Sequence, residues 1–391
     1  MGPLHGVRVL DLTSVLMGPM ATRVLGDLGA DVVVIETGEG DINRAMGPGP
    51  HPELSGVALN LMRNKRSISL DLKTKAGREA FLRLVADADV MVTNLRPGPL
   101  RRLRLGYAEI SAARPDIVFC RAHGYAADSD QAEDPAYDDI IQSASAVGEL
   151  FERSGGQPML MPTLVADKTS GLTIAYAVLA ALFHRERTGE GQEIEIPMIE
   201  VMRSFVLAEH GAGGIAEPPQ SPPGYPRILT PERRPQQTAD GWINVLPYRT
   251  EDFQILFRAG GRDDLIDDPR FATRAERIAN SDSLYRDIAS VLVGNTTVHW
   301  LELCRREGIP ATRAATLTDL VDELPLAEHP HAGRYRQIPS AVNYSRTPTG
   351  VGRHAPLVGE HGREVLAEVG FTDDELTTLE ADGVLGTRSE D

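Results

Sequence analysis

Cysteine is nearly absent from this chain of 391 residues, which contains only Cys120 and Cys304. Two thiols so far apart provide neither a disulfide framework nor a cysteine-based zinc site. Cys120 lies in the apolar run DIVFC, which predicts a place in the core. The low cysteine content therefore excludes the disulfide-stapled class and indicates a reduced, cytoplasmic protein.

Basic side chains are also fewer than acidic ones. The chain has 40 Lys and Arg residues and 56 Asp and Glu residues, which give a net charge of −16. A surface this acidic argues against broad contact with nucleic acid or with anionic lipid. The N-terminus lacks a basic segment followed by an apolar one, and no apolar run is long enough to span a bilayer. We expect no nucleic-acid partner and no membrane.

Several motifs of nucleotide-binding and hydrolytic enzymes are missing. The turn after the first predicted strand reads TSVLMGPM and lacks the G-x-G-x-x-G pattern of nicotinamide sites. The chain also contains no P-loop, no H-E-x-x-H and no G-x-S-x-G. The usual forms of those sites are therefore excluded.

Strand and helix signals alternate along the first third of the chain. Short apolar runs predict strands at 7–12, 31–36, 67–72, 89–94 and 116–120, with helices opening at Gly18-Pro19 and near Lys75. The run DVVVIE suits a strand covered on both faces. This alternation predicts an α/β fold with a doubly wound, Rossmann-like parallel sheet.

The length of the chain exceeds one compact core and predicts about two domains. Residues 206–235 are rich in glycine and proline, which predicts a linker. A new strand–helix region begins at GWINVLP and predicts a small domain over 236–325.

Asp167 is the only acid in the apolar stretch MLMPTLVADKTSGLTIAYAVLAALF. A buried carboxylate is costly unless it is paired or has a function. Position alone leaves two interpretations open, a helix N-cap before Lys168 or a working carboxylate.

Six blocks in this sequence together resemble the family III CoA-transferases, the group that includes formyl-CoA transferase and carnitine CoA-transferase. The first block is VRVLDLTSVLMGPMATRVLGDLGADVVVIE, and the second is RNKRSISLDLKTKAG. The others are NLRPGPLRRLRLGY, AYDDIIQSASAVG, TGEGQEIEIPMIEVM and APLVGEHGREVLAEVGF. Their order over residues 7 to 371 makes the resemblance specific.

The resemblance implies an architecture that composition could not reveal. A large CoA-binding domain would combine residues 1–205 with 326–391, and a smaller α+β domain would be inserted between them. Two such chains would thread through each other as an interlocked-ring homodimer.

The resemblance also implies a chemistry, in which Asp167 matches the nucleophile of the family. Its carboxylate would attack the thioester of an acyl-CoA and later carry CoA itself to a carboxylic acid acceptor. No tightly bound cofactor is needed, and coenzyme A enters as a substrate. Asp167 could act as nucleophile and still interact with the N–H groups of a helix start.

CoA carries three phosphates, so a chain of this charge needs a local cluster of cations to bind it. The family blocks favour Asn94, Arg96 and Arg102 as CoA contacts, followed by Lys65 and Arg66. The alternative is that these charge runs are solvated faces. Leu70 is expected to line the adenine slot or to belong to the strand core.

The turn Val15, Leu16, Met17 follows the first strand, where open α/β sheets bind ligands. Formyl-CoA transferase has a His and a Gln in this turn, whereas this chain has Ser14 and Leu16. The difference predicts an acyl group larger or more apolar than formate or oxalate.

Tyr137 and Asp138 distinguish the transferases from a related branch, the α-methylacyl-CoA racemases. That branch uses a His–Asp pair here, and Tyr137 occupies the place of the His. A phenol is a poor base for an α-proton, which favours transfer over racemisation. Asp138 could orient a neighbour or cap the following helix, and His123 and His361 could be structural or catalytic. A racemase and a catalytically silent acyl-CoA-binding homologue remain the alternatives.

Overall fold

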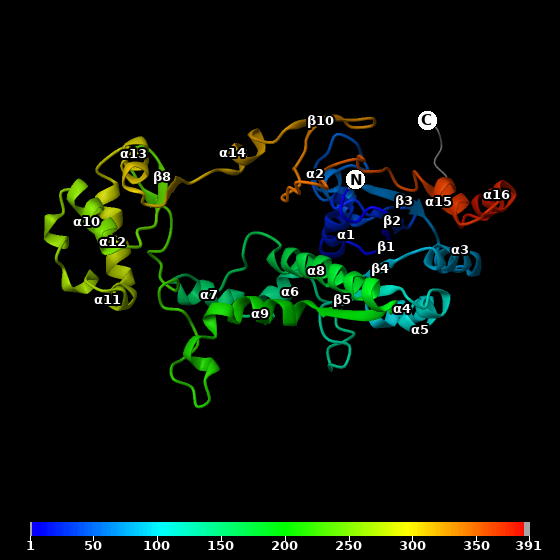
Figure 1. Ribbon diagram of the computed structural model, residues 1–391, viewed down its shortest axis with the longest axis horizontal. Helices are drawn as coiled ribbons and strands as arrows, with labels where there is room; N and C mark the ends of the chain where they lie inside the picture. Colours follow the sequence, from blue (N-terminus) through cyan, green and yellow to red (C-terminus); the bar gives the residue numbers. More distant parts are fainter. Residues whose placement is uncertain (1, 387–391) are drawn as a thin grey trace. The chain divides into compact units, whose positions relative to one another are not determined.

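The computed structural model describes residues 2–386, which divide into two compact units. Unit 1 contains residues 2–145, 162–204 and 324–386. Unit 2 contains residues 146–161 and 205–323. The chain thus leaves unit 1 twice and returns to it with the C-terminal segment, coloured orange to red in Figure 1.

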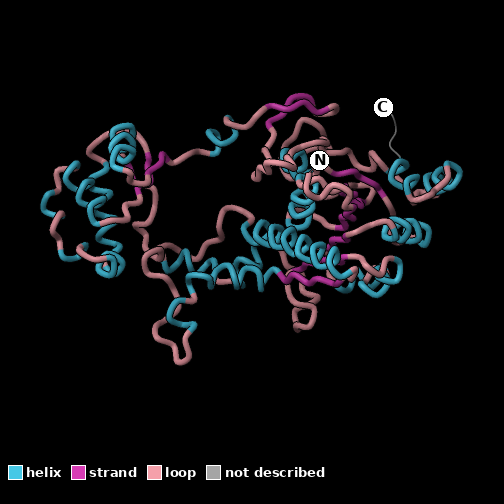
Figure 2. Tube along the Cα trace, viewed as in Figure 1, coloured by secondary structure: helices cyan, strands magenta, loops and turns pink. Residues whose placement is uncertain are grey.

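Unit 1 is built on a six-stranded parallel sheet in the order β3-β2-β1-β4-β5-β6 (Figures 1 and 2). Its strands are β1 (Arg8–Leu12), β2 (Asp31–Glu36), β3 (Lys65–Ser69), β4 (Val90–Thr93), β5 (Val118–His123) and β6 (Gln192–Pro197). The order reverses between β1 and β4, as in doubly wound folds. The prediction of an α/β fold with a Rossmann-like parallel sheet is confirmed.

Helices cover both faces of this sheet. On one face, α3 (Lys75–Ala86), α5 (Tyr107–Ala113), α15 (Gly362–Glu368) and α16 (Asp373–Ala381) share a core with the strands. On the other face, α1 (Met17–Asp27) and α8 (Val165–Thr188) pack against each other and against the strands. Burial on both sides explains the apolar run at residues 32–35 of β2, between Asp31 and Glu36.

The remaining elements of unit 1 are shorter. They are α2 (Gly56–Leu61), α4 (Pro97–Leu103), α6 (Asp138–Ala144) and the hairpin of β10 (Leu326–His329) with β11 (Gly333–Arg336). The helix α9 (Met198–His210) lies where the chain passes from unit 1 to unit 2.

By length and composition, α8 could cross a membrane, and it is the one such helix in the part of the chain that the structure describes. The expectation that no apolar segment reaches this length is therefore wrong. Half of its apolar window is buried inside the protein. Burial of this kind also suits the core helix of a soluble fold.

Unit 2 joins a small antiparallel sheet to a helical layer. The sheet contains β7 (Gln236–Gln237), β8 (Trp242–Val245) and β9 (Ala311–Arg313). The helices are α7 (Val147–Arg153), α10 (Thr250–Ala259), α11 (Arg274–Ala279), α12 (Ser281–Leu292), α13 (Thr297–Glu307) and α14 (Leu317–Asp322). Trp300 is fully buried at the centre, and its indole N–H donates to the Leu292 carbonyl at 2.8 Å.

The units differ in two places from the domains expected from the sequence. Residues 146–161 were expected in the large domain but group with unit 2. Residues 206–235 were expected to form a linker, yet they also belong to unit 2. Proline and glycine in that stretch prevent long regular elements, but they do not prevent packing.

Candidate active site

Asp167 is the third residue of α8, a helix of 24 residues whose N-cap is Leu164. The interpretation of Asp167 as the N-cap is therefore wrong. Its side chain is only 8% exposed. Among the described residues, no hydrogen bond or ion pair to the Asp167 carboxylate is found. Burying a carboxylate without a partner lowers the stability of the fold. Residues in such surroundings are concentrated at functional sites.

Asp138 caps the start of α8 from another helix. One carboxylate oxygen, Oδ1, accepts the backbone N–H groups of Ala166 at 2.8 Å and Asp167 at 3.0 Å. The other oxygen accepts the amide of Gln142 at 2.5 Å. Asp138 begins α6 and does not cap it, so the expected cap of the following helix is wrong. Of the two open interpretations, the structure favours a residue that orients its neighbour.

The pKa of Asp167 is raised to about 7. Burial is the largest cause, followed by the negative charges of Asp138 and Asp139. The partial positive charge at a helix N-terminus acts in the opposite sense, but burial and repulsion outweigh it here. Strongly perturbed groups of this kind are concentrated at functional sites.

The turn at 15–17 lies beside the start of α8. A Cβ atom added to Gly171 would lie 2.7 Å from the carbonyl oxygen of Met17. Gly171 follows Asp167 by one helical turn and therefore lies on the same face of α8. Leu16 and Met17 are buried, whereas Val15 has a φ of 70°, which is a strained conformation for a β-branched residue. Its N–H donates to the Asp41 carboxylate at 3.2 Å.

Asn94 joins the loops that follow β1 and β4, at the point where the strand order reverses. Its side-chain oxygen accepts from the N–H of Ser14 at 2.9 Å, and its amide nitrogen donates to the Ser14 carbonyl at 2.8 Å. Asn94 thus holds together the two loops where such folds bind ligands. This contact within the protein was not predicted from the sequence.

A cavity of about 680 Å³ opens at the carboxyl ends of these strands. Leu70 lines it and also belongs to the core under the sheet, which confirms the expected place in the core, while the adenine slot stays a prediction. Other lining residues are Leu12, Ser14, Glu36, Asp41, Lys73, Leu95 and Leu103. The cavity lies where the topology predicts a ligand site.

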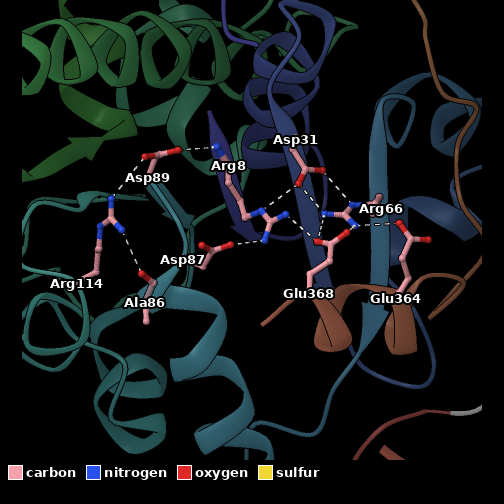
Figure 3. Close-up of polar contacts among 9 residues, drawn as sticks. All are labelled: Arg8, Asp31, Arg66, Ala86, Asp87, Asp89, Arg114, Glu364 and Glu368. Atoms are coloured by element: carbon pink, nitrogen blue, oxygen red, sulfur yellow. Dashed lines mark hydrogen bonds and ion pairs between the residues drawn. The ribbon is translucent and has the colours of Figure 1, made fainter. Parts of the chain in front are cut away.

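Lys65 and Arg66 have structural roles instead of the expected contacts with CoA. Lys65 is fully buried, and its ammonium lies 2.9 Å from Asp11 and 3.0 Å from the Pro19 carbonyl. Arg66 lies in an ion-pair network with three acids (Figure 3), namely Asp31 at 2.6 Å, Glu368 at 2.7 Å and Glu364 at 3.0 Å. Both residues lie at the amino end of β3, whereas Leu70 follows its carboxyl end. These ion pairs leave neither cation free for a phosphate.

One cation lines the cavity, and two others are next in sequence to its lining residues Leu95 and Leu103. Lys73 lines it and is exposed, and it was not predicted, because the charge run at 63–66 was favoured instead. Arg96 is exposed and donates to the Glu133 carbonyl at 2.7 Å. Arg102 is exposed on α4, without a hydrogen-bond or ion-pair partner among the described residues. The position of Lys73 just after the carboxyl end of β3 was the signal that could have identified it.

The remaining candidates lie in different surroundings. Tyr137 is 66% exposed. His123 is buried at the end of β5, where its Nε2 lies 3.2 Å from Glu195. Burial lowers its pKa. His361 links the C-terminal segment to β3, because its two ring nitrogens lie 3.3 Å from the N–H of Ser67 and 3.1 Å from Arg353.

Comparison with known proteins identifies the family. The model of CoA-transferase family III matches residues 4–362. A succinyl-CoA:glutarate CoA-transferase of Mus musculus is 31% identical, with 94% of this chain and 87% of that protein covered. A succinyl-CoA:mesaconate CoA-transferase of Haloarcula hispanica is 32% identical, with 95% and 97% covered. The crystal structure of a CAIB/BAIF family protein from Brucella suis has a TM-score of 0.80 at 28% identity, with 94% and 99% covered. The chain belongs to the family III CoA-transferases.

Proposed function

We propose that this enzyme moves CoA from an acyl-CoA to a free carboxylic acid, with Asp167 as the covalent nucleophile. The observation that carries the proposal is the buried Asp167 carboxylate at the start of α8, for which the described residues provide no hydrogen-bond or ion-pair partner. The relatives named as succinyl-CoA:glutarate and succinyl-CoA:mesaconate CoA-transferases support both an acyl-CoA as donor and a free carboxylic acid as acceptor.

The reaction can proceed in balanced steps without an external acid or base. The Asp167 carboxylate attacks the thioester carbonyl, and CoA thiolate leaves as a mixed anhydride forms. The thiolate then attacks the aspartyl carbonyl, which releases the donor acid and forms an aspartyl-CoA thioester. The acceptor carboxylate attacks this thioester and expels the thiolate again. Attack of the thiolate on the acceptor carbonyl of the second anhydride gives the new acyl-CoA and restores Asp167.

The CoA moiety is assigned to the cavity at the carboxyl ends of β1 to β4. Its volume of about 680 Å³ and the apolar wall around Leu70 suit an adenine ring. Lys73 and the exposed Arg102 supply positive charge for the phosphates, and Arg96 is a further candidate. Asn94 acts through the Ser14 loop, which it holds in place. CoA is a substrate in this proposal, and no tightly bound cofactor takes part.

The acyl group is assigned to the region beside the turn at 15–17. Leu16 and Met17 present apolar side chains there, where formyl-CoA transferase has polar ones. This environment favours an acid larger or more apolar than formate or oxalate. Tyr137 is exposed and is a further candidate for contact with the substrate.

An interlocked homodimer in the cytoplasm completes the proposal. The exposed side chains of Leu172, Tyr176 and Phe183 on α8 support it, because a monomer would leave this apolar row in water. Light scattering at decreasing protein concentration tests this part. A dimer that persists to nanomolar concentration is expected, and a monomer would contradict it.

The nucleophile is tested by trapping. The protein is incubated with a panel of acyl-CoAs and hydroxylamine, and the peptide containing Asp167 is weighed. A hydroxamate on Asp167 is expected with a true donor, and Asp167→Asn is expected to abolish transfer while CoA affinity stays within a few-fold. Exchange of the α-hydrogen with deuterated water, without any hydroxamate, would instead support a racemase. Neither signal would support a silent binding homologue.

A further inference from the structure

Unit 2 contains a small cavity to which no function has been assigned so far. Its volume is about 70 Å³, and every lining residue belongs to unit 2. The walls come from α10, α11, α12, the segment that follows β8 and the loop that carries Arg227, and half of the lining residues are apolar: Leu246, Pro247, Phe253, Ile278, Leu284 and Ile288. The cavity is thus a slot with both apolar and polar walls, within one compact unit.

Three arginines line this slot, namely Arg227, Arg274 and Arg277. Arg277 is half-buried and uses one nitrogen for the Phe271 carbonyl at 2.8 Å and the Thr250 hydroxyl at 3.2 Å. Arg227 is half-buried, lies 5.5 Å from the centre of the Tyr248 ring, and has the hydroxyl groups of three tyrosines as hydrogen-bonding neighbours, namely Tyr225, Tyr248 and Tyr285. Arg274 is exposed at the first position of α11.

None of the three forms an ion pair with an acid in the part of the chain that the structure describes. Other arginines of the same unit do, since Arg249 lies 2.6 Å from Asp252 and Arg262 lies 2.8 Å from Asp264. The slot therefore collects three positive charges without a carboxylate partner among the described residues. An anion in the slot would accept charge-assisted hydrogen bonds from these guanidinium groups.

The shape and the lining of the slot select the class of anion. The slot is too small for a nucleotide or for CoA, whose sites are several times larger. Inorganic phosphate would gain nothing from the apolar walls. A planar carboxylate matches the two-pronged geometry of a guanidinium, and a short aliphatic chain matches the leucine and isoleucine walls.

The geometry points to a binding site for a short aliphatic carboxylate in unit 2. The carboxylate lies among Arg227, Arg274 and Arg277, and the chain lies against Phe253, Leu284 and Ile288. Binding at this site requires neither Asp167 nor any covalent step. A test of this binding site therefore gives a result that does not depend on whether the proposed transfer route is correct.

The test uses the full-length protein with butyrate, and with butyramide as the uncharged analogue. Saturation-transfer NMR titration measures the affinity, and hydrogen exchange followed by mass spectrometry locates the bound acid. We expect saturable binding of butyrate, no binding of butyramide, and slower exchange in peptides covering residues 274–288. Arg274→Gln should weaken binding roughly tenfold, because one charge-assisted hydrogen bond is lost.

Arg258→Gln is the matched control, since Arg258 is an exposed arginine on α10 that does not line the slot. Its affinity for butyrate should equal that of the wild type. Arg227→Gln provides a second variant should Arg274→Gln fold poorly. Equal binding of butyramide, absence of protection over residues 274–288, or an unchanged affinity in both slot variants would each overturn the assignment.

Discussion

Asp138 accepts a hydrogen bond from the backbone N–H of Asp167 at 3.0 Å, so the two carboxylates of the candidate site are linked through the start of one helix. The same contact has two opposed effects. It fixes the first turn of α8, and it places a negative charge near the Asp167 carboxylate. That charge is the second cause of the raised pKa of Asp167, after burial. Asp138 thus both positions the proposed nucleophile and makes its protonation sensitive to pH near neutrality.

The first prediction concerns Asp138→Asn. An asparagine oxygen can still accept the two N–H groups, but the negative charge is gone. The pKa of Asp167 should fall, because a neighbouring like charge disfavours ionisation. Since the nucleophile must be ionised, transfer in the wild type should rise with pH through about 7. In the variant, the acidic limb of kcat/KM against pH should move down by about one pH unit.

Two further variants separate charge from geometry in this prediction. Asp138→Ala removes the cap as well as the charge and should lower the stability by about 1 kcal/mol. Asp139→Asn removes the charge that acts more weakly on the pKa of Asp167. The acidic limb of its kcat/KM profile should therefore move less than that of Asp138→Asn. An acidic limb that stays in place in Asp138→Asn would show that Asp138 does not act on the nucleophile through its charge.

The second prediction concerns the stability of Asp167→Asn. In the wild type, the pKa of Asp167 is higher in the folded state than in the unfolded chain. The folded state therefore binds more protons between pH 4 and 7, and its stability falls as the pH rises through that window. The Asp167→Asn variant has no ionisable group at this position, so its stability does not fall in this way. It should be more stable than the wild type at pH 8, by up to about 4 kcal/mol, and the difference should shrink towards pH 4.

Urea denaturation at pH 4.5 and pH 8 measures this difference, and Asp252→Asn provides a control of opposite sign. Burial raises the pKa of Asp252, but hydrogen bonds from Arg249 outweigh it, and the net pKa is lowered. Asp252→Asn should therefore lose stability at pH 8. An Asp167→Asn variant that is no more stable than the wild type at pH 8 would mean that the Asp167 carboxylate has a partner in the assembled protein.

The sequence predicted the sheet well because strands covered on both faces need apolar interiors, and residues 32–35 of β2 and 90–92 of β4 provide them. A single acid in an apolar stretch drew attention to Asp167, but its position left a helix cap and a working carboxylate open, and its role as nucleophile came only from the family resemblance. The sequence could not predict that Asp138 caps α8, because that contact joins residues 29 positions apart. It also misassigned Lys65, since a charge run gives no indication that Asp11, 54 positions away, is the partner of this lysine.

The third prediction separates the structural lysine from the proposed ligand contact. Lys65→Met leaves the buried Asp11 without its cation and should lower the stability by about 3 kcal/mol, with CoA affinity unchanged in the folded fraction. Lys73→Met should leave the stability unchanged and weaken CoA binding about fivefold, through loss of one charged contact. Calorimetric titration with CoA and urea denaturation measure the two effects.

The control for this pair is Lys75→Met, two residues beyond Lys73. Lys75 is exposed and lies 3.6 Å from Glu79 on the same helix, a contact of small energy. Neither CoA affinity nor stability should change appreciably. If Lys73→Met binds CoA as tightly as Lys75→Met does, the phosphates do not lie at this edge of the cavity.

The fourth prediction concerns the strained turn beside the nucleophile. Val15 has a φ of 70°, a conformation that glycine adopts without strain and a β-branched residue does not. Its side chain is only half-buried, so little packing is lost in Val15→Gly. The variant should therefore gain about 1 kcal/mol of stability from relief of strain.

Transfer by Val15→Gly should nevertheless fall, because strain that persists at a site is maintained by the geometry the site requires. A fall in kcat/KM of about tenfold is expected, since a looser turn no longer holds Leu16 and Met17 against α8. Ala146 has a φ of 66° and precedes α7 in unit 2, so Ala146→Gly tests strain relief away from the turn. It should gain stability and keep its transfer rate. If both variants lose transfer equally, or if Val15→Gly transfers as fast as the wild type, the strain at Val15 does not serve the active site.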